Sequence, residues 1–434
     1  MGQGIISRSN PGNSGDKVGD IRITTRNTLG EKWALCNGAK LSDEHIDPDN
    51  PKHWSLLGIT KTDFEDYIDD YMSKNYDNFH CTYLTYRDGP VCDDNGNIYM
   101  CYFVVIEHGT DNTTNATNLV IKYDGSDFSI FYSWYEGGGD PKIFNDIDGS
   151  GIKIVEDSGY NDIRIPNTGD QYNDLFGFSI INACTFLGVY KNKPILLMYG
   201  TDDSEYYYNL CVGTNIVLYG FAKDNYVNSG IIRLYDKNSF IFWYTTADSI
   251  IVKRYNNDGT ISNIVSLQIE SEDLAINMYH CYDANSNIIY FFSESNDAFI
   301  CTIDLNTNEG EVSYNKPSDY LIKSIISYNG YSRAIVDYSN ASPGYTFITS
   351  IEEALYSTNP YDMQLIGYGD FTISKVIGPE IAFSDSDGSI HTVLYGDNYE
   401  DGNGDNNDFV ILSGTALPTI SVDDESYCFI KIKD

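Results

Sequence analysis

The segment from Asp146 to Asp157 carries residues whose types and spacing could bind a cation. Oxygen-bearing side chains occupy its first, third, fifth and twelfth positions, on Asp146, Asp148, Ser150 and Asp157, and Gly151 occupies the sixth. Calcium loops place ligands at these positions and use a glycine at the sixth for a sharp turn. The sequence therefore predicts a candidate Ca²⁺ site here and indicates no other cofactor. The twelfth ligand is Asp rather than the longer Glu, so a glycine-rich hairpin with hydrated acids is the alternative.

A run of three tyrosines, from Tyr206 to Tyr208, is the densest aromatic cluster of the chain. In a strand the side chains alternate between the two faces, so Tyr206 and Tyr208 share one face. Two aromatic rings on one face could stack on a sugar, which makes these residues a candidate binding site. The alternative is that both rings pack between neighbouring sheets.

Signatures of catalysis are missing from the sequence. It contains neither the H-E-x-x-H zinc motif nor the G-x-S-x-G nucleophile turn. We therefore expect a binding protein and not an enzyme. The alternative is a glycan depolymerase or glycosidase, which would need two facing carboxylates.

Charge and composition exclude several classes of partner. The formal net charge of the 434 residues is −36, which repels nucleic-acid phosphates and anionic lipid. No run of about 18 apolar residues is present, so we expect no membrane insertion. The nine cysteines form no C-x-x-C pair and lie mostly in apolar stretches. They are predicted to be buried free thiols, as in proteins that fold in a reducing cytoplasm.

The elements that must position these residues are short strands. At steps of roughly 40–55 residues, a turn of Asn, Gly or Asp leads into an apolar-aromatic strand, a polar gap and a second strand. The starts of the repeats fall near residues 97, 150, 195, 240, 287, 333 and 380. One antiparallel sheet of three or four strands per repeat is the blade of a β-propeller.

We therefore predict a mostly β chain in which residues 81–434 form a β-propeller of six or seven blades. Tandem β-sandwiches are the alternative, because they also consist of many short strands. The apolar strand Tyr427–Ile432 at the end of the chain needs a partner, and we expect it to complete the first blade.

The first 80 residues differ from the rest. Residues 1–16 are rich in Gly, Ser and Asn and are predicted to be a flexible arm, followed by a small α+β module over 17–80. The module contains two predicted strands, Ile21–Thr25 and Trp33–Cys36, and one helix. The helix is predicted from a capping box of Thr62 and Glu65. Its apolar face is predicted from four residues at helical spacing, which are Phe64, Ile68, Tyr71 and Met72.

The beginning of this module resembles the tail-collar-type domains of bacteriophage and prophage tail proteins. The resemblance is carried by Val18-Gly19-Asp20-Ile21 and by Trp33-Ala34-Leu35-Cys36-Asn37-Gly38, with Leu56-Leu57-Gly58 standing for a later element. It implies a docking hairpin in which Trp33 packs and Asn37 and Gly38 form the tight turn. The chain departs from the pattern between Asp43 and Trp54, where it is longer and more polar.

The resemblance implies a structural component of a phage virion or phage-like particle, in a tail, baseplate or tail fibre. It would be assembled in the cytoplasm of the host bacterium and would attach through its N-terminal module. The propeller would then contact other virion proteins or a host-surface glycan or protein, in multiple copies on a symmetric particle. A head fibre or capsid decoration protein is an alternative placement.

Overall fold

The computed structural model describes most of the middle of the chain and short stretches near both ends. The described residues are 21–24, 33–35, 54–76, 80–108, 113–135, 140–157, 163–172, 181–202, 205–221, 226–234, 236–269, 278–283, 286–293, 300–313, 321–328, 331–338, 345–349, 364–365, 371–376, 383–384, 390–398, 407–414 and 427–431. The chain divides into two compact units. We call residues 52–414 the propeller unit, and residues 1–51 with 415–434 the terminal unit.

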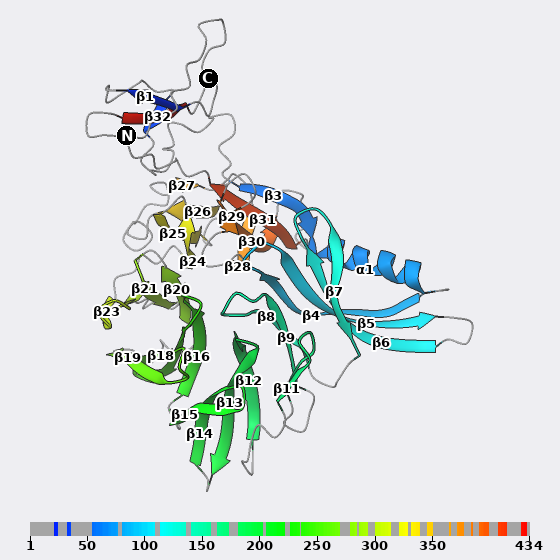
Figure 1. The fold of residues 1–434 in the computed structure, drawn as a ribbon, viewed down its shortest axis with the longest axis horizontal. Helices are drawn as coiled ribbons and strands as arrows, with labels where there is room; N and C mark the ends of the chain where they lie inside the picture. Colours follow the sequence, from blue (N-terminus) through cyan, green and yellow to red (C-terminus); the bar gives the residue numbers. More distant parts are fainter. Residues whose placement is uncertain are drawn as a thin grey trace, which may run out of the picture. The chain divides into compact units, whose positions relative to one another are not determined.

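The described residues of the propeller unit form seven antiparallel sheets that follow one another in chain order (Figure 1). Six of them consist of four consecutive strands each. The first three sheets are β4 (His80–Cys92), β5 (Ile98–His108), β6 (Thr113–Tyr123) and β7 (Phe128–Trp134); β8 (Lys142–Asn145), β9 (Ile152–Asp157), β10 (Ile163–Ile165) and β11 (Asp170–Tyr172); and β12 (Ile181–Tyr190), β13 (Lys193–Asp202), β14 (Glu205–Val212) and β15 (Asn215–Phe221).

The fourth to sixth sheets repeat this arrangement. They are β16 (Tyr226–Arg233), β17 (Phe240–Thr246), β18 (Ser249–Tyr255) and β19 (Ile261–Gln268); β20 (Met278–Asp283), β21 (Ile288–Ser293), β22 (Ile300–Asp304) and β23 (Glu309–Ser313); and β24 (Leu321–Tyr328), β25 (Tyr331–Tyr338), β26 (Tyr345–Thr349) and β27 (Gln364–Leu365). Strands joined in simple up-and-down order form propeller blades, whereas sandwiches use Greek-key connections. The predicted propeller is confirmed, with seven sheets.

The seventh sheet joins the two ends of the propeller unit. Its strands are β28 (Phe371–Val376), β29 (Phe383–Ser384), β30 (Ile390–Asn398), β31 (Asn407–Gly414) and β3 (Trp54–Thr60). β3 comes from the start of the unit and pairs antiparallel with β31 from its end. This pairing covers the edge of β31 and closes the propeller without using the last strand of the chain.

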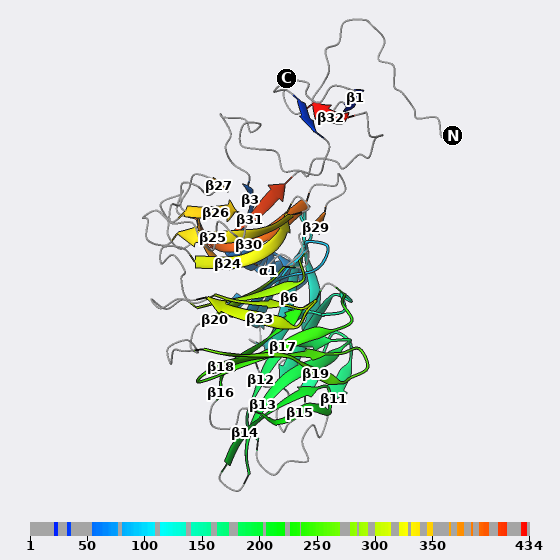
Figure 2. The same ribbon diagram turned by 90° about the vertical axis from the view of Figure 1, so that its left-hand side faces the viewer.

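Sheets are held together by apolar side chains that they bury between them. Four clusters of buried residues join sheets one and two, two and three, three and four, and four and five. β17 illustrates why the sheets must cover one another, because all but the last of its seven residues are buried. A strand that is apolar on both faces requires a cover on each face, and neighbouring sheets supply it. Figure 2 shows the sheets stacked in this way from the side.

Helix α1 (Lys61–Asn75) connects β3 to β4 and packs on the first sheet. Phe64, Ile68 and Met72 are buried, as predicted, and Tyr71 is partly buried. The predicted start is wrong by two residues, because the capping box is formed by Thr60 and Asp63. β3 runs directly into the helix, so its last residue becomes the N-cap.

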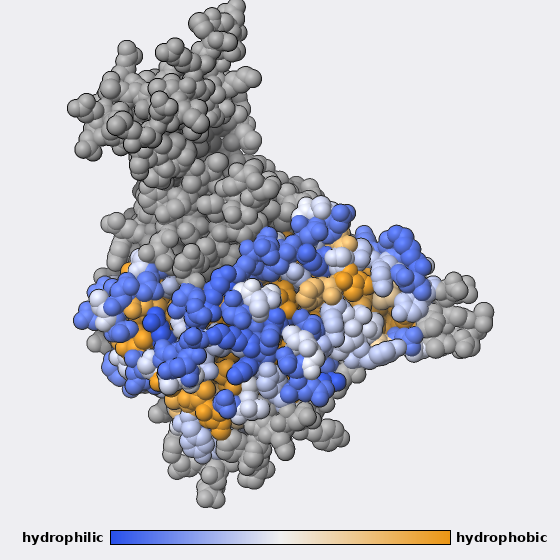
Figure 3. Space-filling view, in the orientation of Figure 1, coloured by the Kyte–Doolittle hydropathy of each residue, from blue (hydrophilic) through white to orange (hydrophobic). Residues whose placement is uncertain are grey.

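Aspartates shape many of the hairpin turns. The carboxylates of Asp93, Asp124, Asp236, Asp258 and Asp304 each accept a hydrogen bond from the backbone N–H two residues later, at 2.7–3.1 Å. Such Asx turns reproduce the geometry of a backbone turn. Some of the acidic residues therefore stabilise turns. Figure 3 shows that the coloured surface on this side of the molecule is mostly hydrophilic.

The terminal unit is built from both ends of the chain. β1 (Ile21–Thr24) and β2 (Trp33–Leu35) flank β32 (Tyr427–Lys431) in a three-stranded sheet. The two N-terminal strands were predicted, but β32 pairs with them and does not complete the first blade. The predicted boundary at residue 80 also moves to residue 51, because β3 belongs to the seventh sheet and α1 packs on the first.

Within the described ranges, no helix has the length and apolar character needed to span a bilayer. Seven cysteines of the propeller unit, all within described ranges, are free thiols, and five of them are buried. The prediction of buried free thiols is therefore confirmed for those five, which are Cys92, Cys101, Cys211, Cys281 and Cys301.

Candidate functional site

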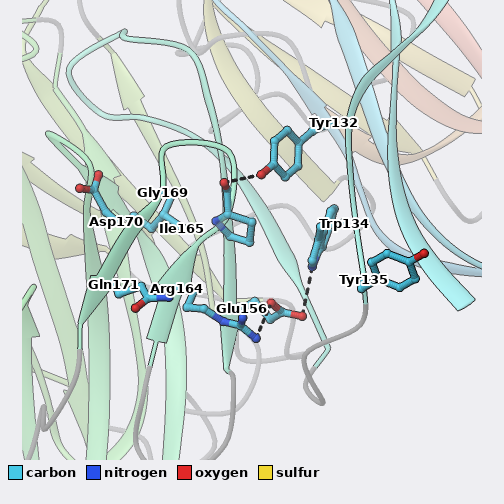
Figure 4. Close-up of a pocket in the computed structure, with 10 residues that line it drawn as sticks. Tyr132, Trp134, Tyr135, Glu156, Arg164, Ile165, Gly169, Asp170 and Gln171 are labelled. Atoms are coloured by element: carbon cyan, nitrogen blue, oxygen red, sulfur yellow. Dashed lines mark hydrogen bonds and ion pairs between the residues drawn. The ribbon is translucent and has the colours of Figure 1, made fainter.

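A pocket of about 340 Å³ lies between the first and second sheets (Figure 4). One wall comes from the end of β7 and the residue after it, and the other comes from β9, β10, β11 and the turn before β11. Its volume is near the lower end of the range for small-molecule sites, about 300–1,000 Å³. The pocket therefore has the size for a small ligand.

Three aromatic side chains form the wall on the first sheet, and a β-bulge turns two of them toward the second. In the pairing of β6 with β7, Ile121 lies opposite Ile130, but Val120 lies opposite Tyr132, so the register shifts at Phe131. An extra residue in one strand reverses which face the following side chains occupy. Tyr132 and Trp134 consequently pack toward the second sheet, against a cluster that includes Ile143, Ile152 and Ile154.

The polar floor of the pocket is a buried carboxylate beside a guanidinium. Glu156 on β9 lies directly opposite Arg164 on β10 in the register of the second sheet. Its side chain is fully buried, and its Oε2 lies 3.4 Å from a terminal nitrogen of Arg164, whose side chain is 34% exposed. The indole N–H of Trp134 donates a hydrogen bond to Glu156 Oε1 at 3.2 Å. The carboxylate is thus held in one orientation from two sheets.

The remaining wall is a turn fixed by hydrogen bonds. The hydroxyl of Tyr132 donates to the carbonyl oxygen of Pro166 at 2.5 Å, which ties the turn to the first sheet. Thr168 donates from its hydroxyl to a carboxylate oxygen of Asp170 at 2.8 Å. Gln171 follows on β11 with an exposed amide. The pocket therefore combines flat aromatic surface, one cation, two carboxylates and an amide, which together suit a small polar ligand with an apolar face.

The structure brings together three of the four residues of the predicted calcium site, because the side chain of Asp148 lies within hydrogen-bonding distance of both Asp146 and Ser150, whereas Asp157 lies at the far end of β9. Asp146 is buried, and its carboxylate accepts hydrogen bonds from the backbone N–H groups of Lys191 and Asn192, each at 2.9 Å. Asp148 accepts from the backbone N–H of Ser150 at 2.8 Å in the β8–β9 turn, and Asp157 ends β9. Asp146 therefore joins the second sheet to the third. No group of three His, Cys, Asp or Glu side chains within the described ranges is placed to hold a metal ion.

An ion-pair cluster that the sequence did not indicate lies beside the same turn. Asp94 accepts from both terminal nitrogens of Arg233 at 2.6 and 2.7 Å, from Lys237 Nζ at 2.7 Å and from the Asn145 amide at 2.9 Å. Partial burial by itself raises the pKa of Asp94, but the hydrogen bonds from Arg233 and Lys237 outweigh it and hold the pKa well below its usual range. We call these four residues the Asp94 cluster, and they join the first, second and fourth sheets.

None of the described residues that line the pocket is among the other predicted binding residues. Tyr208 lies on β14 of the third sheet, partly buried and with its ring 5.0 Å from that of Tyr199. Tyr206 lies on the same strand. Trp33 begins β2 of the terminal unit, while Asn37 and Gly38 lie outside the described residues. The binding roles predicted for these five residues stay predictions.

The pocket residues carry little signal in the sequence. The aromatic and apolar residues of Phe128–Trp134 indicate a strand, but Trp134 meets Glu156 and Arg164 only through a bulge and through the register of two different sheets. A short aromatic alternation, Tyr132 and Trp134 at the end of a strand, is the one local hint.

The sequence matches no protein-family model and no curated protein. Solved structures resemble it in fold. An acylaminoacyl peptidase from Pyrococcus horikoshii is 10% identical with a TM-score of 0.36, and the match covers 73% of this chain and 49% of that one. The chain therefore spans about half the length of that peptidase.

Two further structures show the same kind of likeness. TolB from Acinetobacter baumannii is 12% identical with a TM-score of 0.29, covering 63% of this chain and 78% of that one. The β-propeller domain of the Trilobed protease from Pyrococcus furiosus is 9% identical with a TM-score of 0.37, covering 73% and 90%. These are likenesses of a β-propeller domain, and they concern the fold alone.

Proposed function

We propose that this chain is a structural component of a phage virion or phage-like particle, in a tail, baseplate or fibre. The terminal unit attaches to other virion proteins, and the propeller unit presents a binding surface to the host. The chain acts in several copies on a symmetric particle that is assembled in the cytoplasm of the host bacterium.

The observation that carries this proposal is the strand order β1-β32-β2. The two strands that bear the collar-like motif, Ile21–Thr24 and Trp33–Leu35, form one sheet with the C-terminal strand and belong to a compact unit apart from the propeller. The propeller is closed by the pairing of β3 with β31, in which the terminal unit takes no part. The chain can therefore attach through its terminal unit without opening the propeller.

The propeller supports the second half of the proposal. Rigid sheets that cover one another hold their connecting segments in fixed positions, and binding sites are disproportionately formed on such segments. The net charge of −36 disfavours nucleic acid and anionic membrane as the partners of this surface.

Particle fractionation tests the proposal. Particles produced from cells that carry the gene are purified by density gradient, and the chain is detected with an antibody and located by electron microscopy. We expect the chain in the particle band, and we expect deletion of residues 1–51 together with 415–434 to remove it from that band. Its absence from every particle fraction would overturn the proposal.

A further inference from the structure

We propose that the pocket between the first and second sheets binds one or two rings of an uncharged sugar. The inference rests on the proposed function for the source of the sugar, which would be a host-surface glycan, but the binding itself is a property of the pocket.

The aromatic wall supplies the contact for the apolar face of a sugar ring. Tyr132 and Trp134 have ring centroids 5.9 Å apart and planes inclined by 35°, so together they form a broad surface along one side of the pocket (Figure 4). Tyr135 follows with 75% of its surface exposed. The C–H groups of a pyranose carry partial positive charge and are attracted to the negative face of an aromatic ring. Water-exposed aromatic surface beside a pocket is typical of ligand contact.

The polar floor supplies partners for the hydroxyl groups. A sugar hydroxyl both donates and accepts, so the partly exposed guanidinium of Arg164 and the exposed side chains of Asp170 and Gln171 match neighbouring hydroxyls. Glu156 is fully buried and accepts a hydrogen bond from Trp134, so its carboxylate positions the Arg164 guanidinium beside the pocket and does not contact a ligand itself.

Charge and size narrow the class of ligand. Glu156 and Asp170 line the pocket against the single cation Arg164, and the whole chain carries −36. This field disfavours uronic acids, sialic acids and phosphorylated ligands. The volume of about 340 Å³ is small among ligand pockets, which favours a segment of one or two sugar units over a long chain.

Saturation-transfer NMR and calorimetry on the purified full chain test this inference. The probes are glucose, galactose, mannose, N-acetylglucosamine, maltose and lactose, with glucuronic acid and sialic acid as charged comparisons. We expect at least one uncharged probe to bind with saturation transferred to its ring C–H protons. We expect Trp134→Ala to weaken binding roughly tenfold or more, and Tyr135→Ala to weaken it several-fold.

Matched variants separate loss of binding from loss of folding. Tyr135 and Gln171 are exposed, so Tyr135→Ala and Gln171→Ala should leave the thermal transition unchanged while weakening binding. Tyr219→Ala, which removes a 63% exposed tyrosine from β15 of the third sheet, should change neither the thermal transition nor the binding.

The inference is overturned if no uncharged probe binds, if the pocket variants bind like Tyr219→Ala, or if the acidic sugars bind more tightly. Trp134→Ala and Tyr135→Ala should still enter the particle band, so failure here and failure of the particle assignment are separate results.

Discussion

Replacing Asp94 by asparagine should destabilise the propeller unit by about 2 kcal/mol. An exposed ion pair contributes about 0.2–1 kcal/mol, whereas removing one partner of a buried pair costs about 3–5 kcal/mol. The side chains of Asp94 and Arg233 are 25% and 21% exposed, so the Asp94 cluster lies between these limits. The substitution leaves Arg233 and Lys237 without their carboxylate in a partly dehydrated site.

This loss converts into a shift that a thermal melt can resolve. Unfolding entropy of about 2.1 cal/mol/K per residue gives about 0.8 kcal/mol/K for the roughly 360 residues of the propeller unit. A loss of about 2 kcal/mol should therefore lower the Tm by about 3 °C. Scanning calorimetry at neutral pH measures the shift, and urea unfolding provides an independent value.

Asp70→Asn is the matched control, because it makes the same change in an exposed pair. Asp70 and Lys74 on α1 are 56% and 68% exposed, so this variant should lose less than about 0.5 kcal/mol. Combining Asp94→Asn with Arg233→Gln should cost less than the sum of the two single changes, because both remove the same pair. Equal shifts for Asp94→Asn and Asp70→Asn, or strict additivity, would refute the role given to the Asp94 cluster.

Two further perturbations follow from side chains packed against Trp243. Loss of hydration lowers the pKa of His280 to about 4 from 6.5, where its ring packs on Trp243. The unfolded chain therefore binds the proton more readily, so the stability that neutral His280 contributes should be lost as the pH falls from about 6.5 to 4. Urea midpoints across this range should fall less steeply in His280→Gln, and an unchanged profile would contradict the assignment. Gly230→Ala would place its Cβ 2.8–2.9 Å from the indole ring of Trp243, so it should cost about 1–3 kcal/mol in urea unfolding, and a neutral result would show that the ring moves aside freely.

The strands of the propeller could be predicted from the sequence because their signals are local. The apolar run Phe240–Tyr244, the turn at Asn257–Gly259 and the strand Ser249–Tyr255 all appear where the residues indicate, and Gly259 has the left-handed backbone, φ +85°, that such a turn requires. Stacked sheets then follow, because a strand that is apolar on both faces must be covered on both.

Pairings between distant segments could not be predicted in the same way. β3 and β31 are separated by almost the whole propeller unit, and nothing in either strand specifies the other as its partner. The pocket depends on the bulge at Phe131 and on the cross-strand placement of Glu156 and Arg164, which are matters of register. The spacing of Asp146, Asp148 and Asp157 resembled a ligand set, but the first of these carboxylates is occupied by backbone N–H groups of the third sheet.

The division into a propeller closed by β3 and a separate terminal unit underlies the proposed function, and the thermal unfolding of a fragment of residues 52–414 tests it most directly. We predict that this fragment gives a β-sheet circular dichroism spectrum and one cooperative transition. A fragment of residues 61–414, which lacks β3, should unfold at a lower temperature. Its free energy of unfolding should fall by more than the loss of about 1 kcal/mol expected from removing the Thr60 helix cap alone. An unfolded 52–414 fragment, or equal transitions for the two fragments, would contradict the account.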